Sequence, residues 1–112
     1  MDKKIGVIMS AYNENIDWVR ESVDSILKQT YSNLKLYITL DNPDNCELRE
    51  LLEYYESTDD RVRLIKNEHN LGLVTCLNKM INIVDEDIIA RMDADDILTC
   101  IVSKKKLIIK HE

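Results

Sequence analysis

The chain has 112 residues, a length that accommodates one domain built around one core. Hydrophobic residues make up 45% of the sequence and charged residues 32%, which is the balance of a globular protein. The formal net charge is −6 and no basic stripe is present, which argues against a nucleic-acid partner. No segment has the length of a membrane span, and the apolar run 5–9 is too short for a signal-peptide core.

The first half of the sequence predicts two strands, each followed by a helix. The continuous apolar run 5–9 suits a strand that is buried on both faces of a sheet. Apolar residues then recur three or four apart between positions 16 and 27, which predicts an amphipathic helix. Residues 34–40 favour a second strand, which stops at a dense turn signal over 41–45. A second helical stripe occupies positions 48–55.

The second half continues the same alternation. Residues 61–66 predict a third strand, 67–72 a loop, 73–84 a third helix and 87–92 a fourth strand that leads directly into Asp93. The order β-α-β-α-β-α-β is typical of an α/β protein with right-handed crossovers. We therefore expect a Rossmann-like fold with three α/β/α layers around a mostly parallel sheet.

Polar residues follow every predicted strand. In parallel sheets, ligands bind beyond the carboxyl ends of the strands, so these positions form a candidate site. They are Ser10, Tyr12, Asn13 and Glu14 after the first strand, Asp41, Asn42 and Asp44 after the second, Asn67 and Asn70 after the third, and Asp93, Asp95 and Asp96 after the fourth.

The run Asp93-Ala94-Asp95-Asp96 places three carboxylates within four residues. Crowded like charges repel, and a bound divalent cation offsets that cost. Mg²⁺ and Mn²⁺ prefer oxygen ligands and commonly link carboxylates to substrate phosphates. The apolar strand before the run favours a metal site over a solvated turn or a helix N-cap. The chain lacks both a Gly-rich dinucleotide fingerprint and a Walker-type loop, so metal coordination is the expected route to a bound phosphate.

Two other residues have alternative interpretations that the sequence leaves open. Asp41 is either an acceptor for a base or ribose or a turn residue before Pro43, and Tyr12 either stacks on a base or closes the edge of the core. The cysteines Cys46, Cys76 and Cys100 match neither a zinc site nor a thioredoxin-like motif. Their pattern favours buried or half-buried free thiols in a reducing cytoplasm.

Five segments, in order, resemble family-2 glycosyltransferases of the nucleotide-diphospho-sugar transferase (GT-A) fold. They are 7–14 (VIMSAYNE), 23–31 (VDSILKQTY), 67–73 (NEHNLGL), 77–79 (LNK) and 89–97 (IARMDADDI). Each motif alone is weak, but the ordered set covers most of residues 4–97 and is highly specific. The resemblance implies that the loop around Ala11 and Tyr12 borders the nucleotide base, and that Asp41 contacts this base, usually uracil.

The resemblance also implies a donor-side metal site. Asp93 and Asp95 match the family's DxD pair, which touches the ribose and coordinates Mn²⁺ or Mg²⁺ on the diphosphate. Asp96 is a third candidate ligand of the metal, and Arg91 either neighbours the diphosphate or braces the loop. The implied function is metal-dependent binding of an NDP-sugar, with a UDP-sugar favoured, for transfer to a hydroxyl of a glycan or another acceptor.

The sequence departs from the family at two places. Asn42 and Pro43 stand where a second Asp and a Gly are usual, and the sequence after position 97 lacks the usual Leu-Pro-x-Arg-Leu-like stretch. We expect residues 1–97 to be the nucleotide-sugar-binding part and 98–112 to be an atypical tail, with the acceptor-binding half and the catalytic base absent. A truncated, non-catalytic nucleotide-binding module of the same fold is therefore the alternative.

Two further expectations follow from this interpretation. A truncated sheet leaves an edge or an apolar patch exposed, so we expect self-association. The expected location is the cytoplasm, including the inner face of the membrane. A flavodoxin-like phosphoacceptor with clustered carboxylates is the least favoured class, because the first-strand loop offers Glu14 as its one acidic residue.

Overall fold

Strands and helices alternate along the chain in the computed structural model, which describes residues 4–28, 34–86 and 88–91. This order confirms the prediction from hydrophobic periodicity. The strand β1 extends two residues beyond the predicted run because Ser10 and Ala11 continue its pairing with β2. The elements are β1 (Ile5–Ala11), α1 (Ile16–Leu27), β2 (Leu34–Leu40), α2 (Cys46–Thr58), β3 (Val62–Lys66), α3 (Leu73–Ile83) and β4 (Ile88–Arg91).

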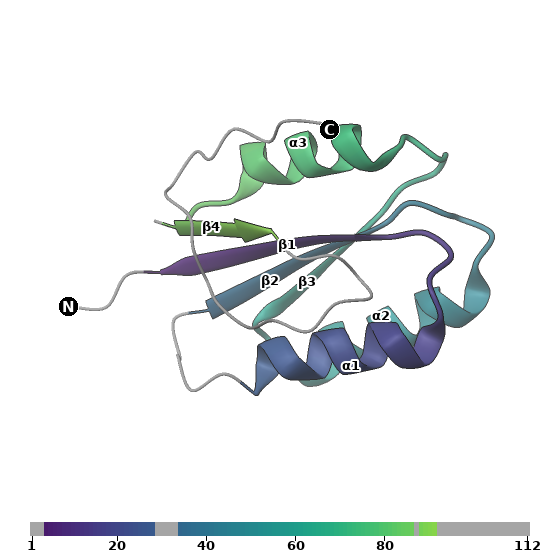
Figure 1. The fold of residues 1–112 in the computed structure, drawn as a ribbon, viewed down its shortest axis with the longest axis horizontal. Helices are drawn as coiled ribbons and strands as arrows, with labels where there is room; N and C mark the ends of the chain where they lie inside the picture. The colour runs from purple at the N-terminus through teal and green to yellow at the C-terminus, as the bar shows by residue number, and fades with distance from the viewer. Residues whose placement is uncertain (1–3, 29–33, 87, 92–112) are drawn as a thin grey trace.

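The four strands form one parallel sheet in the order β3-β2-β1-β4. Two crossovers, through α1 and α2, place the strands successively on one side of β1, whereas the crossover through α3 returns the chain to its other side. Figure 1 shows the result: α1 and α2 lie on one face of the sheet and α3 lies on the other. The predicted three-layer α/β/α fold is confirmed. The direction of winding reverses between β1 and β4, and open α/β sheets bind ligands at such a point.

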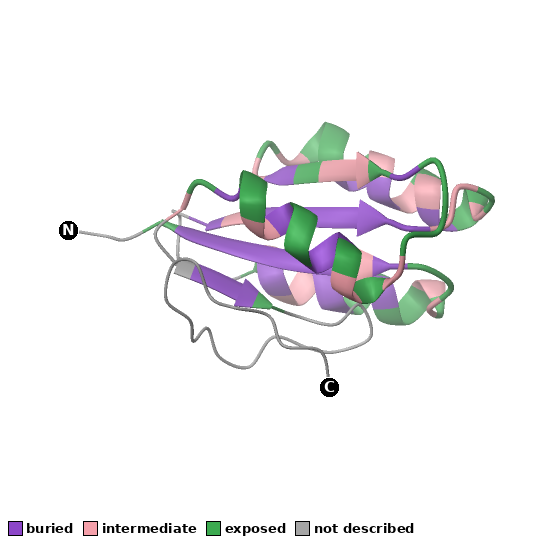
Figure 2. Cartoon of the chain, turned by 90° about the horizontal axis from the view of Figure 1, so that it is seen from above, coloured by how far each residue is buried: buried purple, intermediate pink, exposed green. Residues whose placement is uncertain are grey.

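Burial on both faces explains why residues 5–9 of β1 form a continuous apolar run. Successive side chains of a strand point to opposite faces. Val7, Met9 and Ala11 pack in the core beneath α1 and α2, whereas Ile8 packs in the second core beneath α3. Figure 2 shows the same arrangement as buried strands between helices that expose their outer faces. The sheet is therefore a rigid base for the loops that follow its strands.

Gly6 of β1 lies next to Val84, which directly follows α3. A Cβ atom at this position would lie 2.8 Å from Cγ1 of Val84 and 3.4 Å from the ring of Tyr37. The hydroxyl of Tyr37 donates a 2.7 Å hydrogen bond to Glu86. Burial first, and then this hydrogen bond, raise the pKa of Tyr37 to about 12. A side chain larger than hydrogen at position 6 would therefore disturb the second core.

Asparagine residues begin the first two helices and join the loops before them. The side chain of Asn15 accepts from the N–H groups of Asp17 and Trp18, which caps α1. Asn45 caps α2 through the N–H of Leu48, and its amide donates to the carbonyl of Tyr12 at 3.1 Å. The loops after β1 and β2 are therefore held together at the carboxyl edge of the sheet.

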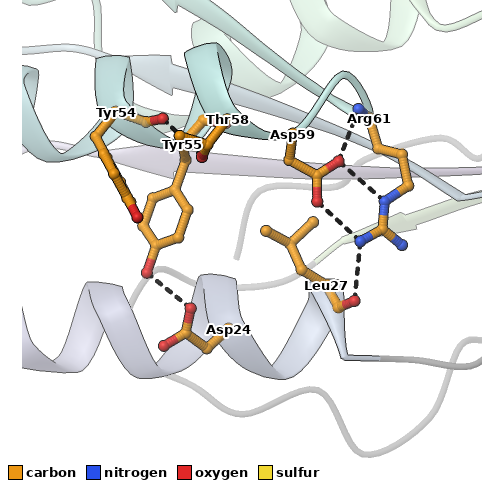
Figure 3. Close-up of polar contacts among 7 residues, drawn as sticks. All are labelled: Asp24, Leu27, Tyr54, Tyr55, Thr58, Asp59 and Arg61. Carbon is orange, nitrogen blue, oxygen red and sulfur yellow. Dashed lines mark hydrogen bonds and ion pairs between the residues drawn. The ribbon is translucent and has the colours of Figure 1, made fainter.

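Away from the carboxyl edge of the sheet, polar contacts join α1 to α2 and to the residues just before β3 (Figure 3). The hydroxyl of Tyr55 in α2 donates a 2.8 Å hydrogen bond to Asp24 in α1. Arg61 forms an ion pair with Asp59 at 2.9 Å and donates to the last carbonyl of α1, that of Leu27, also at 2.9 Å. These contacts hold α1 and α2 together far from the carboxyl edge of the sheet.

Two further expectations concern a membrane span and the boundary after residue 97. Among residues 4–28, 34–86 and 88–91, no helix is long and apolar enough to cross a membrane. The proposed boundary between residues 97 and 98 lies outside the described residues. It therefore stays a prediction.

Candidate functional site

A cavity of about 360 Å³ lies at the carboxyl ends of β1 and β2. Its walls come from the loops after the first three strands and from the start of α3. Residues that are far apart in the sequence therefore meet at one edge of the sheet, as the parallel topology predicts. The residues that line it are Ser10, Tyr12, Glu14, Asp41, Asn70, Gly72 and Leu73.

Among the residues that line this cavity, Asp41 has the side chain with the most hydrogen bonds. It is 3% exposed, and its N–H continues the sheet by donating to the carbonyl of Ala11 at 2.8 Å. Its Oδ1 accepts from the amide of Asn67 and from the N–H of Leu71, both at 2.8 Å. Its Oδ2 accepts from the amide of Asn70 and the N–H of Gly72, both at 2.9 Å. All of these carboxylate partners belong to the loop after β3.

Opposing effects act on the charge of Asp41. Burial acts to raise the pKa of the carboxyl, because it disfavours the ionised form. The hydrogen bonds from Leu71, Asn67 and Gly72 outweigh burial and hold the pKa below its ordinary value. Asp41 is therefore a carboxylate at neutral pH, and its negative charge organises the donors around it.

The loop after β1 supplies another part of the cavity wall. The backbone N–H of Tyr12 donates a 2.7 Å hydrogen bond to Oε1 of Glu14, which makes a tight local turn. The amide of Asn42 donates to Asn13 at 3.0 Å, so the second-strand loop supports this turn. Tyr12 remains 44% exposed. Its ring is therefore accessible to a molecule in the cavity.

Cys76 and Asn67 form a buried layer behind Asp41. The Asn67 amide donates both to Asp41 and to the sulfur of Cys76, the latter at 3.4 Å. Burial first, and then the neighbouring Asp41, raise the pKa of the Cys76 thiol. Cys76 is a buried free thiol, as predicted. Cys46 is also a free thiol, but the prediction that it is buried or half-buried is wrong, because it is exposed at the start of α2. Cys100 lies outside the described residues.

The predicted site residues have different outcomes. Tyr12 and Asp41 line the cavity, and the buried Ala11 lies in the strand beneath it. Arg91 is the last residue of β4 and is exposed. In the register of the sheet it pairs with Ile8 of β1. The acidic run with Asp93, Asp95 and Asp96 lies outside the described residues. Within the part of the chain that the structure describes, no group of three His, Cys, Asp or Glu residues could hold a metal ion.

Sequence reasoning identified Asn67 and Asn70 as polar loop residues but missed their binding to Asp41. It also missed Gly72, whose φ of +92° lies in a region that L side chains rarely adopt. The signal was present as Asn67-Glu68-His69-Asn70-Leu71-Gly72: amide side chains around a glycine directly after a strand. What it did not reveal was the partner, which lies on another strand.

The fold matches that of known GT-A glycosyltransferases. A mannosyltransferase of Pyrobaculum calidifontis, solved in complex with GDP-Man and Mn²⁺, superposes with a TM-score of 0.76 at 20% identity. This similarity covers 89% of the present chain and 30% of the mannosyltransferase. It establishes a GT-A-type arrangement of the sheet and helices.

Sequence comparison then identifies the family. The family described as Glycosyl transferase family 2 matches residues 6–100, and the chain belongs to this family. It is 43% identical over 98 residues to an uncharacterised glycosyltransferase of Methanocaldococcus jannaschii, covering 87% of this chain and 34% of that protein. It is 31% identical over 96 residues to the Escherichia coli enzyme named UDP-Glc:alpha-D-GlcNAc-diphosphoundecaprenol beta-1,3-glucosyltransferase WfgD, covering 86% of this chain and 36% of that enzyme. The chain thus spans about a third of the length of these relatives.

Proposed function

We propose that this chain binds the nucleoside diphosphate part of a sugar-nucleotide donor, with a divalent metal ion, for a glycosyltransferase of family 2. The observation that carries the proposal is the cavity of about 360 Å³ at the carboxyl ends of β1 and β2. It combines an accessible aromatic ring, that of Tyr12, with polar groups at the edge where parallel sheets bind ligands. Membership of the family supports the same assignment.

The base of the nucleotide occupies this cavity in our proposal. Tyr12 stacks on the base, since stacking on an aromatic side chain is a common way to bind a nucleobase. Ala11 supports the floor through its backbone, because its carbonyl accepts from the N–H of Asp41. Asp41 contributes another part of the wall, with its carboxylate bonded to the loop after β3.

The diphosphate and the metal ion belong next to the end of β4 in this proposal. Arg91, the last residue of β4, pairs with Ile8, two residues before Ser10 of the cavity. The sequence then provides Asp93, Asp95 and Asp96, whose carboxylates are the ligand type that Mn²⁺ and Mg²⁺ prefer. Bound there, the metal ion would offset the diphosphate charge and stabilise it as a leaving group. Arg91 would add a positive charge beside the diphosphate.

The donor class follows from the relatives and remains part of the proposal. One structural neighbour was solved with GDP-Man and Mn²⁺, and one relative is named for UDP-Glc. We favour a UDP-sugar, with a GDP-sugar as the other candidate. Transfer to a hydroxyl of a glycan or another acceptor is proposed for the whole enzyme, of which this chain matches about a third.

The proposal also covers the cellular location of the chain and its self-association. Free thiols at Cys46 and Cys76 suit a reducing compartment, so we propose that binding takes place in the cytoplasm. Self-association stays a prediction, and light scattering over a range of concentrations tests it. A strictly monomeric mass at high concentration would contradict it.

Calorimetric titration of UDP and GDP, each with and without Mn²⁺, tests the proposed function. We expect the binding to depend on the metal ion. The variants Asp93→Ala and Asp95→Ala should each weaken it at least tenfold. Glu50→Ala is the matched control, because Glu50 is an exposed acidic residue of α2 outside the cavity. Metal-independent binding, or equal affinities for the three variants, would contradict the metal assignment.

A further inference from the structure

A second cavity lies between α3 and the edge strand β3, and we propose that it binds a small amphipathic carboxylate. This α3 cavity has a volume of about 230 Å³ and is lined by residues of β2, β3 and α3 and by Asn67. It shares no lining residue with the cavity at the carboxyl ends of β1 and β2. The inference therefore goes beyond the proposed binding of a nucleotide.

The topology of the sheet explains why this cavity exists. Among the described residues, two helices cover one face of the four-stranded sheet and α3 alone covers the other. A helix is about 10 Å wide and neighbouring strands are about 4.8 Å apart, so one helix covers about two strands. Because α3 packs mainly on β1 and β2, the side of β3 that faces the same way is left partly open.

One stripe of α3 and one strand supply an apolar lining. Cys76, Lys79, Met80 and Ile83 line the cavity at a spacing of three or four residues, which places them on one side of the helix. Met80 is fully buried, whereas Ile65 of β3 is half-buried and Ile83 is 40% exposed. An apolar group that enters the cavity would remove surface of Ile65 and Ile83 from water, which is favourable.

Two cationic side chains, Arg63 of β3 and Lys79 of α3, line the same cavity. Both residues are exposed, and neither forms an ion pair with a residue that the structure describes, although the net charge of the chain is −6. Lys66 of the same strand, in contrast, pairs with Glu53 at 2.7 Å. A guanidinium and an ammonium beside an apolar lining complement a ligand that combines a carboxylate with an apolar body.

The hydroxyl of Thr39 gives the inner part of the cavity a polar group. Thr39 lines the cavity and is 2% exposed, and its hydroxyl forms no hydrogen bond with a described residue. The hydroxyl is nevertheless accessible, because every fully enclosed polar side-chain atom of the described residues has a partner. Buried hydroxyl groups are normally hydrogen-bonded, so a polar atom at the inner end of the ligand would satisfy this one.

Asn67 and Cys76 separate the α3 cavity from the cavity proposed for the nucleotide. Both residues line the α3 cavity, and the amide of Asn67 donates to the sulfur of Cys76 at 3.4 Å. The same amide donates to Asp41, which lines the other cavity, at 2.8 Å. A ligand in the α3 cavity would therefore not compete with a nucleotide for space.

NMR titration with 3-phenylpropanoate and its neutral amide tests the site. We expect the carboxylate to bind about tenfold more tightly than the amide, which corresponds to two partly exposed ion pairs. The backbone amide resonances of Ile65 and Ile83 should shift during the titration, whereas those of Tyr12 and Gly72 should not. Saturating UDP with Mn²⁺ should leave the affinity for the carboxylate unchanged.

Variants at the two exposed cations locate the carboxylate. Arg63→Gln and Lys79→Gln should each reduce the preference for the carboxylate over the amide about threefold, and the double variant should abolish it. Lys66→Gln is the matched control, because Lys66 is an exposed cation of β3 outside the cavity. It should keep the tenfold preference.

A third probe tests the role of Thr39. We expect 3-(4-hydroxyphenyl)propanoate to bind about fivefold more tightly than 3-phenylpropanoate, because it adds one hydrogen bond. Thr39→Val replaces the hydroxyl with a methyl group of similar size and should make the two affinities equal. A fivefold preference that persists in Thr39→Val would overturn the role of Thr39.

Three results would overturn the site itself. They are a lack of shifts at Ile65 and Ile83, equal affinities for the carboxylate and the amide in the unchanged chain, and a full preference in the double variant. Displacement of the probe by UDP with Mn²⁺ would overturn the separation of the two cavities. A chain that binds the probe but no nucleotide would contradict the proposed function and leave this inference supported.

Discussion

The hydroxyl of Tyr55 donates to the carboxylate of Asp24 at 2.8 Å, and this contact joins α2 to α1 across 31 residues of sequence. Burial first, and then the bond to Asp24, raise the pKa of the Tyr55 hydroxyl. Tyr55 therefore stays neutral and remains a donor throughout the physiological range. The contact is one of the polar contacts that hold α1 and α2 together (Figure 3).

Removal of the Tyr55 hydroxyl tests the strength of this contact. We expect Tyr55→Phe to lower the free energy of unfolding by about 1 kcal/mol, the net value of a typical hydrogen bond. Urea denaturation measures the change. Tyr54→Phe is the matched control, because Tyr54 is 60% exposed and its hydroxyl has no hydrogen-bond partner among the described residues. Equal losses in the two variants would show that the bond to Asp24 contributes nothing specific.

The acid dependence of stability should follow Asp41 and Asp59. The hydrogen bond from Arg61 is the main cause that lowers the pKa of Asp59, while loop donors outweigh burial at Asp41. Lowered folded-state pKa values mean that the charged forms contribute stability that is complete above about pH 5. This contribution is lost as the pH falls below about 4, through the folded-state values.

Asp59→Asn measures one part of this dependence. The variant should be less stable than the wild type at neutral pH and should lose less stability on acidification, as followed by urea denaturation at several pH values. Glu50→Gln, at an exposed position of α2, should keep the wild-type dependence. If Asp59→Asn showed the wild-type acid slope, the ion pair with Arg61 would not be a source of it.

A methyl group at Gly6 should destabilise the second core. Its Cβ would lie 2.8 Å from Cγ1 of Val84, closer than side-chain contacts allow. We expect Gly6→Ala to cost about 1–3 kcal/mol, the usual cost of overpacking. The control is the double variant with Val84→Ala, in which the contact is removed. The combined cost should be smaller than the sum of the two single costs, and simple additivity would exclude the clash.

The ring of Tyr12 should be required for nucleotide binding but not for folding. Tyr12→Ala is expected to weaken UDP or GDP binding about tenfold, since stacking on an aromatic ring contributes about 1–3 kcal/mol per base. Tyr12→Phe retains the ring and should bind like the wild type. Tyr54→Ala, which removes another exposed aromatic ring outside the cavity, is the control. Equal losses in the Phe and Ala variants would assign the effect to the hydroxyl instead of stacking.

The alternation of strands and helices could be predicted from the sequence alone. The apolar run at Ile5–Met9 and the periodic stripe of α1 report local burial, and burial on one or two faces fixes the type of element. The polar positions of the site were also accessible, because parallel topology brings the residues after the strands to one edge. The helix caps Asn15 and Asn45 were not assigned, since asparagine is equally common in turns.

The contacts of the site residues could not be predicted, because they form between distant parts of the chain. A carboxylate at the end of a strand is compatible with base recognition or with a turn, and the sequence left both open for Asp41. The structure places four donors on it from residues 26 to 31 positions away, a relationship that no local pattern contains. Glu14 was one polar residue among several until folding placed it beside Tyr12 in the cavity wall. Hydrophobic periodicity is a local property, whereas the hydrogen-bond partner of a buried charge depends on which strands become neighbours.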